Sequence, residues 1–313
     1  MFRLVKTEQD IGVTKHHSGW PWILDHMRKH ETPDGILIDD FLDRTISLPK
    51  KRMPFDYPYK EPFIGIFHHS ADSPRWLKCL RDRTLDAEMA SPRWRKISDH
   101  CAGFIALSDH VASQLKERTT LPVCSITHPI RDDGDQWSLA AWEKSKRVTQ
   151  VGYYGRNVQA IWQLPPVAGC QYFRLKVPGH MWNSHNKSAK HRYRGRRKYY
   201  PGVTDVSTLS NTAYNKLLCS SVIIMELVTG SANNVVVECI VRGTPLLLNR
   251  YAPAVEYLGE DYPMFYDNMD HAASLITRDK LLETHEYLKA KDKTPLRVET
   301  FISDVKDFVG ICR

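Results

Sequence analysis

The segment "GSANNVVVECIVRGTPLLLNRYAPAVEYLG", residues 230–259, carries the strongest structural pattern in the chain. Small and polar residues lead into an apolar run that stops at Gly243, which predicts a loop followed by a helix with a C-terminal glycine. "TPLLLN" then predicts a buried strand, and "APAVEYLG" predicts a short helix that ends at Gly259. Because the apolar strand "VIIMEL" (222–227) precedes the loop, the segment has the strand–helix–strand order of a parallel α/β sheet.

One carboxylate, Glu238, interrupts the apolar part of the predicted helix. In open α/β sheets, ligands bind at the carboxyl ends of the strands, where the free N–H groups of helix N-termini attract anions. The small residues Gly230, Ser231 and Ala232 would let a phosphate approach the backbone closely. One turn further on, Glu238 is placed to accept hydrogen bonds from the hydroxyls of a ribose. A carboxylate that only complements the helix dipole would occupy the same position, so both interpretations remain open.

Further apolar runs bounded by polar or turn residues predict buried parallel strands at 35–43, 63–70, 102–108 and 122–129, and again at 148–156. Residues 91–100 and 108–118 predict helices between them, whereas the polar segment 132–147 reads as a linker. The patterns together predict an α/β protein of two doubly wound parallel sheets, with domains at 1–140 and 141–295. Residues 296–313 predict an amphipathic helix, which we expect to pack back on the first domain.

The composition of the 313 residues, with 42% hydrophobic and 26% charged, is that of an ordinary globular protein. No apolar stretch is long enough for a membrane span, and the N-terminus lacks a signal-peptide pattern, so we expect a soluble cytoplasmic protein. The seven cysteines are scattered without a C-x-x-C pair, which argues against a disulfide framework and a thiolate zinc site.

The net charge of +8 comes mostly from residues 185–200, which contain seven Lys and Arg and no acidic residue. This basic segment is open to three interpretations. It could be an exposed loop, since charge runs are commonly solvated. It could bind nucleic-acid phosphates, with Tyr193, Tyr199 and Tyr200 stacking on bases. It could also hold the protein at a membrane surface by binding anionic headgroups near an anionic or membrane-associated acceptor.

The run "SANNVVVECIVRGTPLLLN", with "EYLG" after it, resembles the donor-binding half of retaining, nucleotide-sugar-dependent glycosyltransferases of the GT-B fold, in which two Rossmann-like domains face each other. The resemblance implies that Glu238 binds the ribose of the donor. In the family a second glutamate, eight residues earlier, contacts the sugar. That position is Gly230 here, and Glu226 is the nearest substitute. Ser231, Asn233 and Asn234 take the loop positions that face phosphate and sugar.

The same resemblance extends to "VGYYGRN", where the family places an arginine that binds the diphosphate, and this arginine is Arg156. The family's companion lysine falls on Lys176 in "FRLKVPG". Either cation could instead be an ordinary exposed surface charge.

Two stretches of the first half supply further candidates. In "KHHSGWPWIL" (15–24), Gly19 would face the donor phosphates with Ser18 beside it, while Trp20 and Trp22 would pack on an acceptor sugar or belong to the core.

In "IFHHSADSP", His68 and His69 end a strand, and one of them would hydrogen-bond the transferred sugar or act as a base. Successive residues point to opposite faces, so only one of the two histidines can face the cleft. Asp72 and Asp109 are additional candidates.

Several motifs are missing. The chain has no G-x-G-x-x-G, G-x-x-x-x-G-K-[ST] or G-x-S-x-G, which argues against dehydrogenases, P-loop enzymes and common hydrolases. The "DDGD" at 132–135 lies in the polar linker and reads as a solvated turn, so we expect no metal and no cofactor. The resemblance, together with the lack of a metal-binding pattern, implies a metal-independent glycosyltransferase that uses a UDP- or GDP-sugar and a glycan or other hydroxyl acceptor. The alternatives are a nucleic-acid-binding protein and an inactive nucleotide-binding module.

Overall fold

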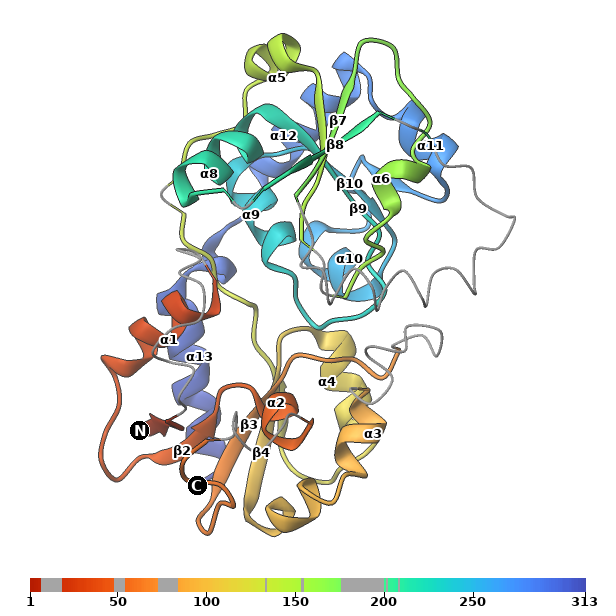
Figure 1. Ribbon diagram of the computed structural model, residues 1–313. Helices are drawn as coiled ribbons and strands as arrows, with labels where there is room; N and C mark the ends of the chain where they lie inside the picture. The colour runs from red at the N-terminus through yellow and green to blue at the C-terminus, as the bar shows by residue number, and fades with distance from the viewer. Residues whose placement is uncertain are drawn as a thin grey trace.

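The computed structural model describes residues 1–6, 19–47, 54–72, 84–132, 134–152, 155–175, 200, 202–207 and 209–313. Two α/β domains are stacked end to end, and the chain returns to the first domain after completing the second (Figure 1). Each domain is built on one parallel sheet, with strand orders β1-β2-β3-β4-β5 and β11-β10-β9-β6-β7-β8. The prediction of two doubly wound parallel sheets is therefore confirmed.

In chain order, the first domain contains β1 (Phe2–Leu4), α1 (Trp20–Arg28), β2 (Ile36–Asp39), α2 (Leu42–Ser47), β3 (Phe63–Phe67), α3 (Leu85–Met89), two 3-10 turns (Trp94–Lys96 and Ser98–His100), β4 (Cys101–Ala106), α4 (Asp109–Lys116) and β5 (Val123–Ser125). Neighbouring residues of β3 and β4 point to opposite faces, so each face of the sheet has its own core. Ile64 and Ile105 pack on the α1 side, whereas Phe63 and Phe104 pack on the opposite side.

The second domain contains α5 (Leu139–Ser145), β6 (Arg147–Gln150), α6 (Ala160–Gln163), β7 (Gln171–Leu175), β8 (Val203–Val206), α8 (Asn211–Ser220), β9 (Ser221–Met225), α9 (Asn234–Arg242), β10 (Leu246–Asn249), α10 (Ala252–Leu258), β11 (Phe265–Tyr266), α11 (Met269–Ser274), α12 (Arg278–Ala290) and a 3-10 turn (Thr294–Leu296). Figure 1 shows α8, α9 and α12 on one face of the second sheet and α6 and α11 on the other. Every residue of β9 is buried, as expected for a central strand covered on both faces.

The last helix, α13 (Val298–Ile311), leaves the second domain and packs on the first sheet beside α1 (Figure 1). Its apolar face is fully buried in the core that contains Phe2, Leu4 and Ile23. The buried residues of α13 are those of the predicted stripe: Val298, Phe301, Ile302, Val305, Phe308 and Val309. The chain returns to the first domain because an amphipathic helix is stable only when its apolar face is covered.

Two local predictions were wrong. The predicted helix at 91–100 forms two short 3-10 turns instead. The predicted polar linker 132–147 contains the helix α5. Two residues of this segment, Trp137 before the helix and Trp142 inside it, are buried in the hydrophobic core of the second domain. Two buried indoles remove enough apolar surface from water to hold a largely polar segment on the domain. The polar composition of the segment therefore did not predict its structure.

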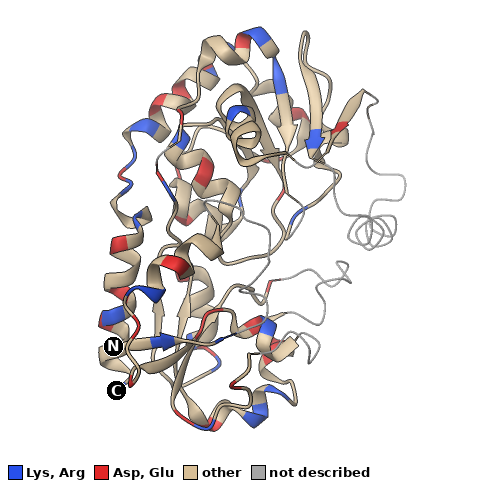
Figure 2. Cartoon of the chain, turned by 60° about the vertical axis from the view of Figure 1, so that its left-hand side comes forward, with Lys and Arg blue, Asp and Glu red and all other residues tan. Residues whose placement is uncertain are grey.

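Acidic and basic residues are interspersed over both domains in the part of the chain that Figure 2 colours. Among the described helices, none combines the length and the apolar character needed to cross a bilayer.

Candidate functional site

An open pocket of about 440 Å³ lies where the carboxyl ends of strands from both sheets meet. Asp72 follows β3 of the first domain, Glu226 follows β9 of the second, and Asn249 ends β10. Parallel α/β sheets bind their ligands at this edge, and small-molecule pockets occupy about 300–1,000 Å³. The described residues that line the pocket are Asp72, Glu226, Leu227, Val228, Asn249, Tyr251 and Ala252.

Buried amide groups hold Glu226 in place at this pocket. Asn157 Nδ2 donates to Glu226 Oε2 over 2.8 Å, and the backbone N–H of Asn157 donates to the Glu226 carbonyl over 2.8 Å. The carbonyl of Asn157 in turn accepts from Gln150 Nε2 over 2.7 Å. Since Asn157 and Gln150 are both buried, the carboxylate is presented from a rigid polar support.

Arg156 lies beneath the turn that connects β6 to α6. It is 6% exposed, and its Nη1 donates to the Val151 carbonyl over 2.8 Å. Gly152 has φ +72°, and a Cβ there would lie 2.6 Å from Arg156 Nη1, so the turn needs glycine to pass over the guanidinium. The backbone of Arg156 pairs with that of Leu227, a residue of the pocket wall.

Glu238 is 1% exposed on α9, and its Oε2 accepts a hydrogen bond from Tyr214 Oη on α8 over 2.8 Å. Burial and the Glu238 carboxylate raise the pKa of Tyr214 well above its usual range, so the phenol keeps its proton and remains the donor. The charge of Arg156 acts on Tyr214 in the opposite direction. Arg156, Tyr214 and Glu238 are therefore close enough to influence one another electrostatically within the second domain.

The loop before α9 contacts the first domain directly. Ser231 is fully buried, its N–H donates to the His68 carbonyl over 2.9 Å, and its Oγ accepts from Leu107 N over 2.9 Å. Gly230 has φ +128°, a conformation that favours glycine. Asn233 caps α9 by accepting from Val235 N over 3.0 Å, and Asn234 is its first residue. Of these candidates, Ser231 thus contacts the first domain directly, whereas Asn233 and Asn234 form the start of α9.

His68 stands at the domain boundary and is partly buried. Its Nε2 lies 3.0 Å from the Asp40 carbonyl, and its ring packs against Trp20 and Phe41 at centroid distances of 4.8 and 3.9 Å. Desolvation lowers its pKa well below the usual value, and the neighbouring His128 lowers it further. At neutral pH, His68 is therefore an uncharged imidazole.

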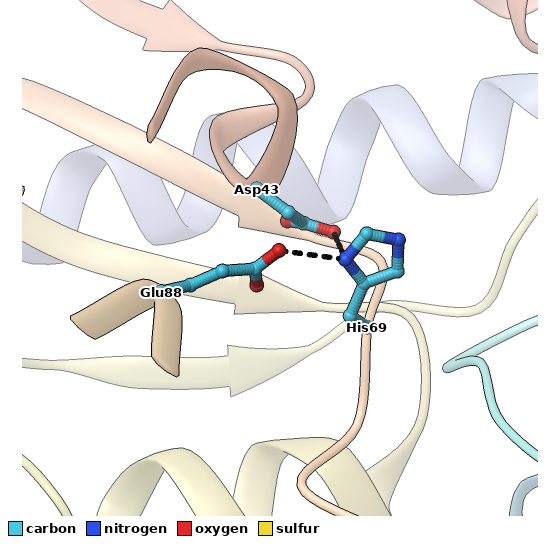
Figure 3. A group of neighbouring side chains, drawn as sticks. All are labelled: Asp43, His69 and Glu88. Carbon is cyan, nitrogen blue, oxygen red and sulfur yellow. Dashed lines mark hydrogen bonds and ion pairs between the residues drawn. The ribbon is translucent and has the colours of Figure 1, made fainter. Parts of the chain in front are cut away.

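His69 points away from the boundary into a buried group with Asp43 and Glu88 (Figure 3). Its Nδ1 lies 2.9 Å from Glu88 Oε1 and 3.3 Å from Asp43 Oδ2. Burial raises the pKa of Asp43 to about 7, and the carboxylate of Glu88 adds to the rise while His69 opposes it. Ligand atoms this close could hold a cation, and no sequence spacing indicated the group because the three residues come from separate elements.

Asp43 also connects this group to the domain boundary, since its carboxylate accepts from the backbone N–H of His68 at 2.8 and 3.1 Å. Gly19 precedes α1 as its N-cap, and Trp20 and Trp22 pack against the core of the first domain. Trp20 Nε1 donates to Asp40 Oδ2 over 2.9 Å.

The other candidates are not among the described lining residues of the pocket, or they lie outside the described part of the chain. Asp109 begins α4, and its N–H donates to Glu256 Oε2 over 2.7 Å. Within the "DDGD" sequence, Asp132 and Asp135 are exposed. Four candidates, Ser18, Lys176, Tyr193 and Tyr199, lie outside the described residues, together with the basic segment up to residue 199.

Sequence reasoning missed the residues of α10 that attach the second domain to the first. Glu256 accepts from the backbone N–H groups of Asp109 and His110, each over 2.7 Å. Tyr257 Oη donates to the Leu107 carbonyl over 2.6 Å and accepts from His128 N over 2.8 Å. Tyrosine is common at interfaces because its ring is apolar and its hydroxyl is polar. The presence of Tyr257 in the predicted helix could therefore have indicated an interface.

Solved structures similar to this chain share its two-domain architecture. TarM of S. aureus, in a mutant form with fondaparinux, alpha-GlcNAc-glycerol and UDP, is 10% identical with a TM-score of 0.58, over 92% of this chain and 58% of TarM. HepE of Anabaena, in complex with UDP-glucose, is 11% identical with a TM-score of 0.59, over 93% and 82% of the two chains. WaaG, a glycosyltransferase involved in lipopolysaccharide biosynthesis, is 13% identical with a TM-score of 0.51, over 95% and 84%.

No protein-family model and no curated protein sequence matches the chain. The chain spans little more than half the length of TarM, and identities of 10–13% carry the fold alone. At that level the resemblance drawn from "SANNVVVECIVRGTPLLLN" is confirmed: the chain has the GT-B fold and is similar over nearly all of its length to GT-B glycosyltransferases.

Proposed function

We propose that the chain is a glycosyltransferase that moves a sugar from a UDP- or GDP-sugar to a glycan or other hydroxyl acceptor, with retention and without a metal. The observation that carries the proposal is the open pocket of about 440 Å³ at the joint carboxyl edge of the two sheets. Its polar walls come from both domains, as a reaction between a donor and an acceptor requires. HepE with UDP-glucose and TarM with UDP support the same donor class.

In this proposal, Glu238 binds the ribose. The carboxylate is buried on α9 and accepts a hydrogen bond from Tyr214. A ribose hydroxyl would either replace the phenol or share the carboxylate with it. A carboxylate accepts several hydrogen bonds at once, and bonds to charged groups are the stronger ones.

Arg156, assisted by Lys176, stabilises the leaving diphosphate. Negative charge grows on the diphosphate as the glycosidic bond breaks, and a preorganised cation lowers the barrier. The guanidinium is fixed beneath the Gly152 turn, so it would not have to reorganise during the reaction. Asn233 and Asn234 at the start of α9 would bring backbone N–H groups toward the same charge, whereas Ser231, whose N–H is bound to the His68 carbonyl, would hold this loop against the first domain.

The sugar would lie between Glu226 and the first domain. His68 is an uncharged imidazole at the boundary whose Nε2–H donates to the Asp40 carbonyl, so its Nδ1 can accept one hydrogen bond from the sugar, whereas His69 is committed to Asp43 and Glu88. In a retaining transfer the departing phosphate oxygen can take the proton of the acceptor hydroxyl on the same face, so no protein base is needed. Gly19 would limit the phosphate side of the cleft from the N-terminus of α1.

Thermal-shift and calorimetric titrations with UDP-, GDP- and CDP-sugars test the proposal. One nucleotide sugar should raise the melting temperature, and release of its nucleoside diphosphate should continue in excess EDTA. Binding without turnover would instead indicate an inactive nucleotide-binding module. Turnover that disappears with chelator and returns with manganese would contradict the metal-independent mechanism.

A further inference from the structure

A second pocket, of about 310 Å³, lies between α8 and the second sheet and shares no described lining residue with the pocket between the domains. Its volume is within the range of small-molecule sites. We propose that this pocket binds a medium-chain fatty acid, with the aliphatic chain between α8 and the sheet and the carboxylate at Arg147 and Lys216. The inference goes beyond glycosyl transfer and does not depend on it.

Three neighbouring strands form one wall of this fatty-acid pocket. Arg147, Phe173 and Val206 come from β6, β7 and β8, and the register of these strands places the three side chains on the same face of the sheet. The strand β8 is the last in the sheet order, so no further strand encloses this side. The Arg147 guanidinium lies over the Phe173 ring, with 5.2 Å between Cζ and the ring centroid.

The helix α8 forms the opposite wall. Its lining residues recur at the spacing i, i+3, i+4 and i+7, so they lie along one stripe of the helix: Ala213, Lys216, Leu217 and Ser220. Ala213 and Ser220 have small side chains, which leaves space between the helix and the sheet. Leu209, in the segment between β8 and α8, adds a partly buried apolar side chain.

The pocket has a cationic end and an apolar end. Arg147 is paired in register with Ser221, the residue that follows α8, and Lys216 belongs to the second half of that helix. Both cations are exposed, so they lie at the rim toward the end of α8. Val206 ends β8 and Ala213 lies in the first turn of α8, so the apolar residues lie toward the other end. An aliphatic chain with one anionic terminus has the same polarity along its length.

The chemistry of the described lining disfavours a sugar or a nucleotide in this pocket. Besides the two cations, the polar side chain is that of Ser220, whose Oγ donates to the Lys216 carbonyl over 2.7 Å. A buried sugar needs several hydrogen-bonding partners, and the apolar side chains of Phe173 and Leu217 do not supply them. A fatty acid needs a partner for its carboxylate alone, and an arginine and a lysine provide it.

Isothermal calorimetry at neutral pH, where a carboxylate is ionised, tests the assignment with decanoate. Octanoate shortens the chain, whereas decan-1-ol and decyltrimethylammonium keep its length and replace the anion by a neutral or a cationic group. The variants are the double substitution Arg147→Gln with Lys216→Gln, which removes the charges, and Ala213→Phe, which fills the space. The control is Lys289→Gln, an exposed lysine of α12 paired with Glu286. Circular dichroism checks the fold of each variant.

We expect decanoate to bind about tenfold more tightly than octanoate, since each buried methylene contributes a factor of about four. The double variant should weaken decanoate binding about tenfold and leave decan-1-ol unchanged, because two rim charges are lost. Ala213→Phe should weaken both ligands, and Lys289→Gln neither. If Ala213→Phe does not fold, the double variant decides alone, since both of its positions are exposed.

The inference is overturned if decanoate does not bind, if decyltrimethylammonium binds as tightly, or if the double variant retains the affinity of the wild type. A dimer that Ala213→Phe dissociates, measured by size-exclusion chromatography, would also overturn it and assign the pocket to a second copy of the chain. Turnover of nucleotide sugars is measured separately, so either proposal can fail without the other.

Discussion

Each domain holds two carboxylates near the face on which it meets the other, but the two sets differ in burial and in the side chains that hold them. In the first domain, Asp43 and Glu88 surround the imidazole of His69, and Asp43 also accepts the backbone N–H of His68. In the second domain, Glu238 is held by the neutral phenol of Tyr214, and Glu226 by the amide of Asn157. The carboxylates of the first set are buried and lie against an imidazole, so we expect them to support the fold, whereas Glu226 lines the open pocket and can be reached by a ligand.

The difference assigns separate tasks to the two domains. The first supplies a rigid base, in which the segment from His68 to Ser70 crosses to the second domain: Ser70 Oγ lies 3.2 Å from Thr229 Oγ1 and 3.0 Å from Tyr251 Oη. The second supplies the charged groups for the donor. Changes in the first set should therefore alter stability, and changes in the second should alter binding.

Glu238→Ala should cause the largest loss, and the loss should be in nucleotide affinity. Two ribose hydroxyls would lose a charged acceptor worth about 1.5–3 kcal/mol per bond, and transfer would be abolished. Isothermal calorimetry with the best-binding nucleotide measures the effect, and circular dichroism checks the fold. Tyr214→Phe is the matched control, since it keeps the carboxylate and should cost much less. Equal affinity for the wild type and Glu238→Ala would remove the ribose assignment.

His69→Ala should act on stability instead. Removing the imidazole leaves two buried carboxylates without this partner, and breaking a buried pair typically costs about 3–5 kcal/mol. Urea unfolding monitored by fluorescence gives the free energy of unfolding. His100→Ala, an exposed histidine in a 3-10 turn of the same domain, is the control and should change little. A loss as small as that of the control would mean that the group does not support the first domain.

The pH dependence of stability should reveal Asp43. Its pKa is raised from 3.8 to about 7 in the folded protein, chiefly by burial, so folding favours its protonated form. That contribution is complete below about pH 3.8 and is lost as the pH rises through about 7. The free energy of unfolding of wild type, minus that of Asp43→Asn, should thus fall over this window. His128, whose pKa burial lowers to about 4, gives an opposite slope that cancels in the difference. A flat or rising difference would contradict the assignment.

Deleting residues 186–198 should have the smallest effect on donor binding. The segment is hydrophilic and without apolar periodicity, and the donor contacts proposed at Arg156 and Glu238 lie elsewhere. Turnover on an anionic acceptor should fall at low salt and recover relative to wild type as salt rises, because exposed charges are screened within about 10 Å at 0.1 M. A soluble neutral acceptor serves as the control. Loss of donor binding at every salt concentration would place the segment in the active site.

The sequence predicted the second sheet and its edge well because the relevant residues are contiguous. The loop, α9 and β10 follow each other within 230–249, so a local pattern located Glu238 next to the anion-attracting helix terminus. The sequence also predicted the buried stripe of α13, because the helical spacing of its apolar residues is enough to define the buried face.

Contacts between distant elements could not be predicted in the same way. Asp43, His69 and Glu88 come from α2, the end of β3 and α3, and no spacing rule connects them. Tyr214 lies on the face of α8 that sequence periodicity assigns to the core, so its hydrogen bond to Glu238 had no signal. Asn157 follows Arg156 directly, but the sequence pattern assigned a role only to the arginine. These are consequences of tertiary packing, which a single sequence specifies but does not display.

The most direct measurement is a crystal structure of the chain with the nucleotide sugar that gives the largest thermal shift. We expect the ribose within hydrogen-bond distance of Glu238, the diphosphate at the N-terminus of α9 on the Arg156 side, and the sugar ring in the pocket between Glu226 and Asp72. A nucleotide bound away from the joint carboxyl edge, or a ring outside that pocket with both carboxylates facing solvent, would contradict the proposed division between supporting and ligand-binding carboxylates.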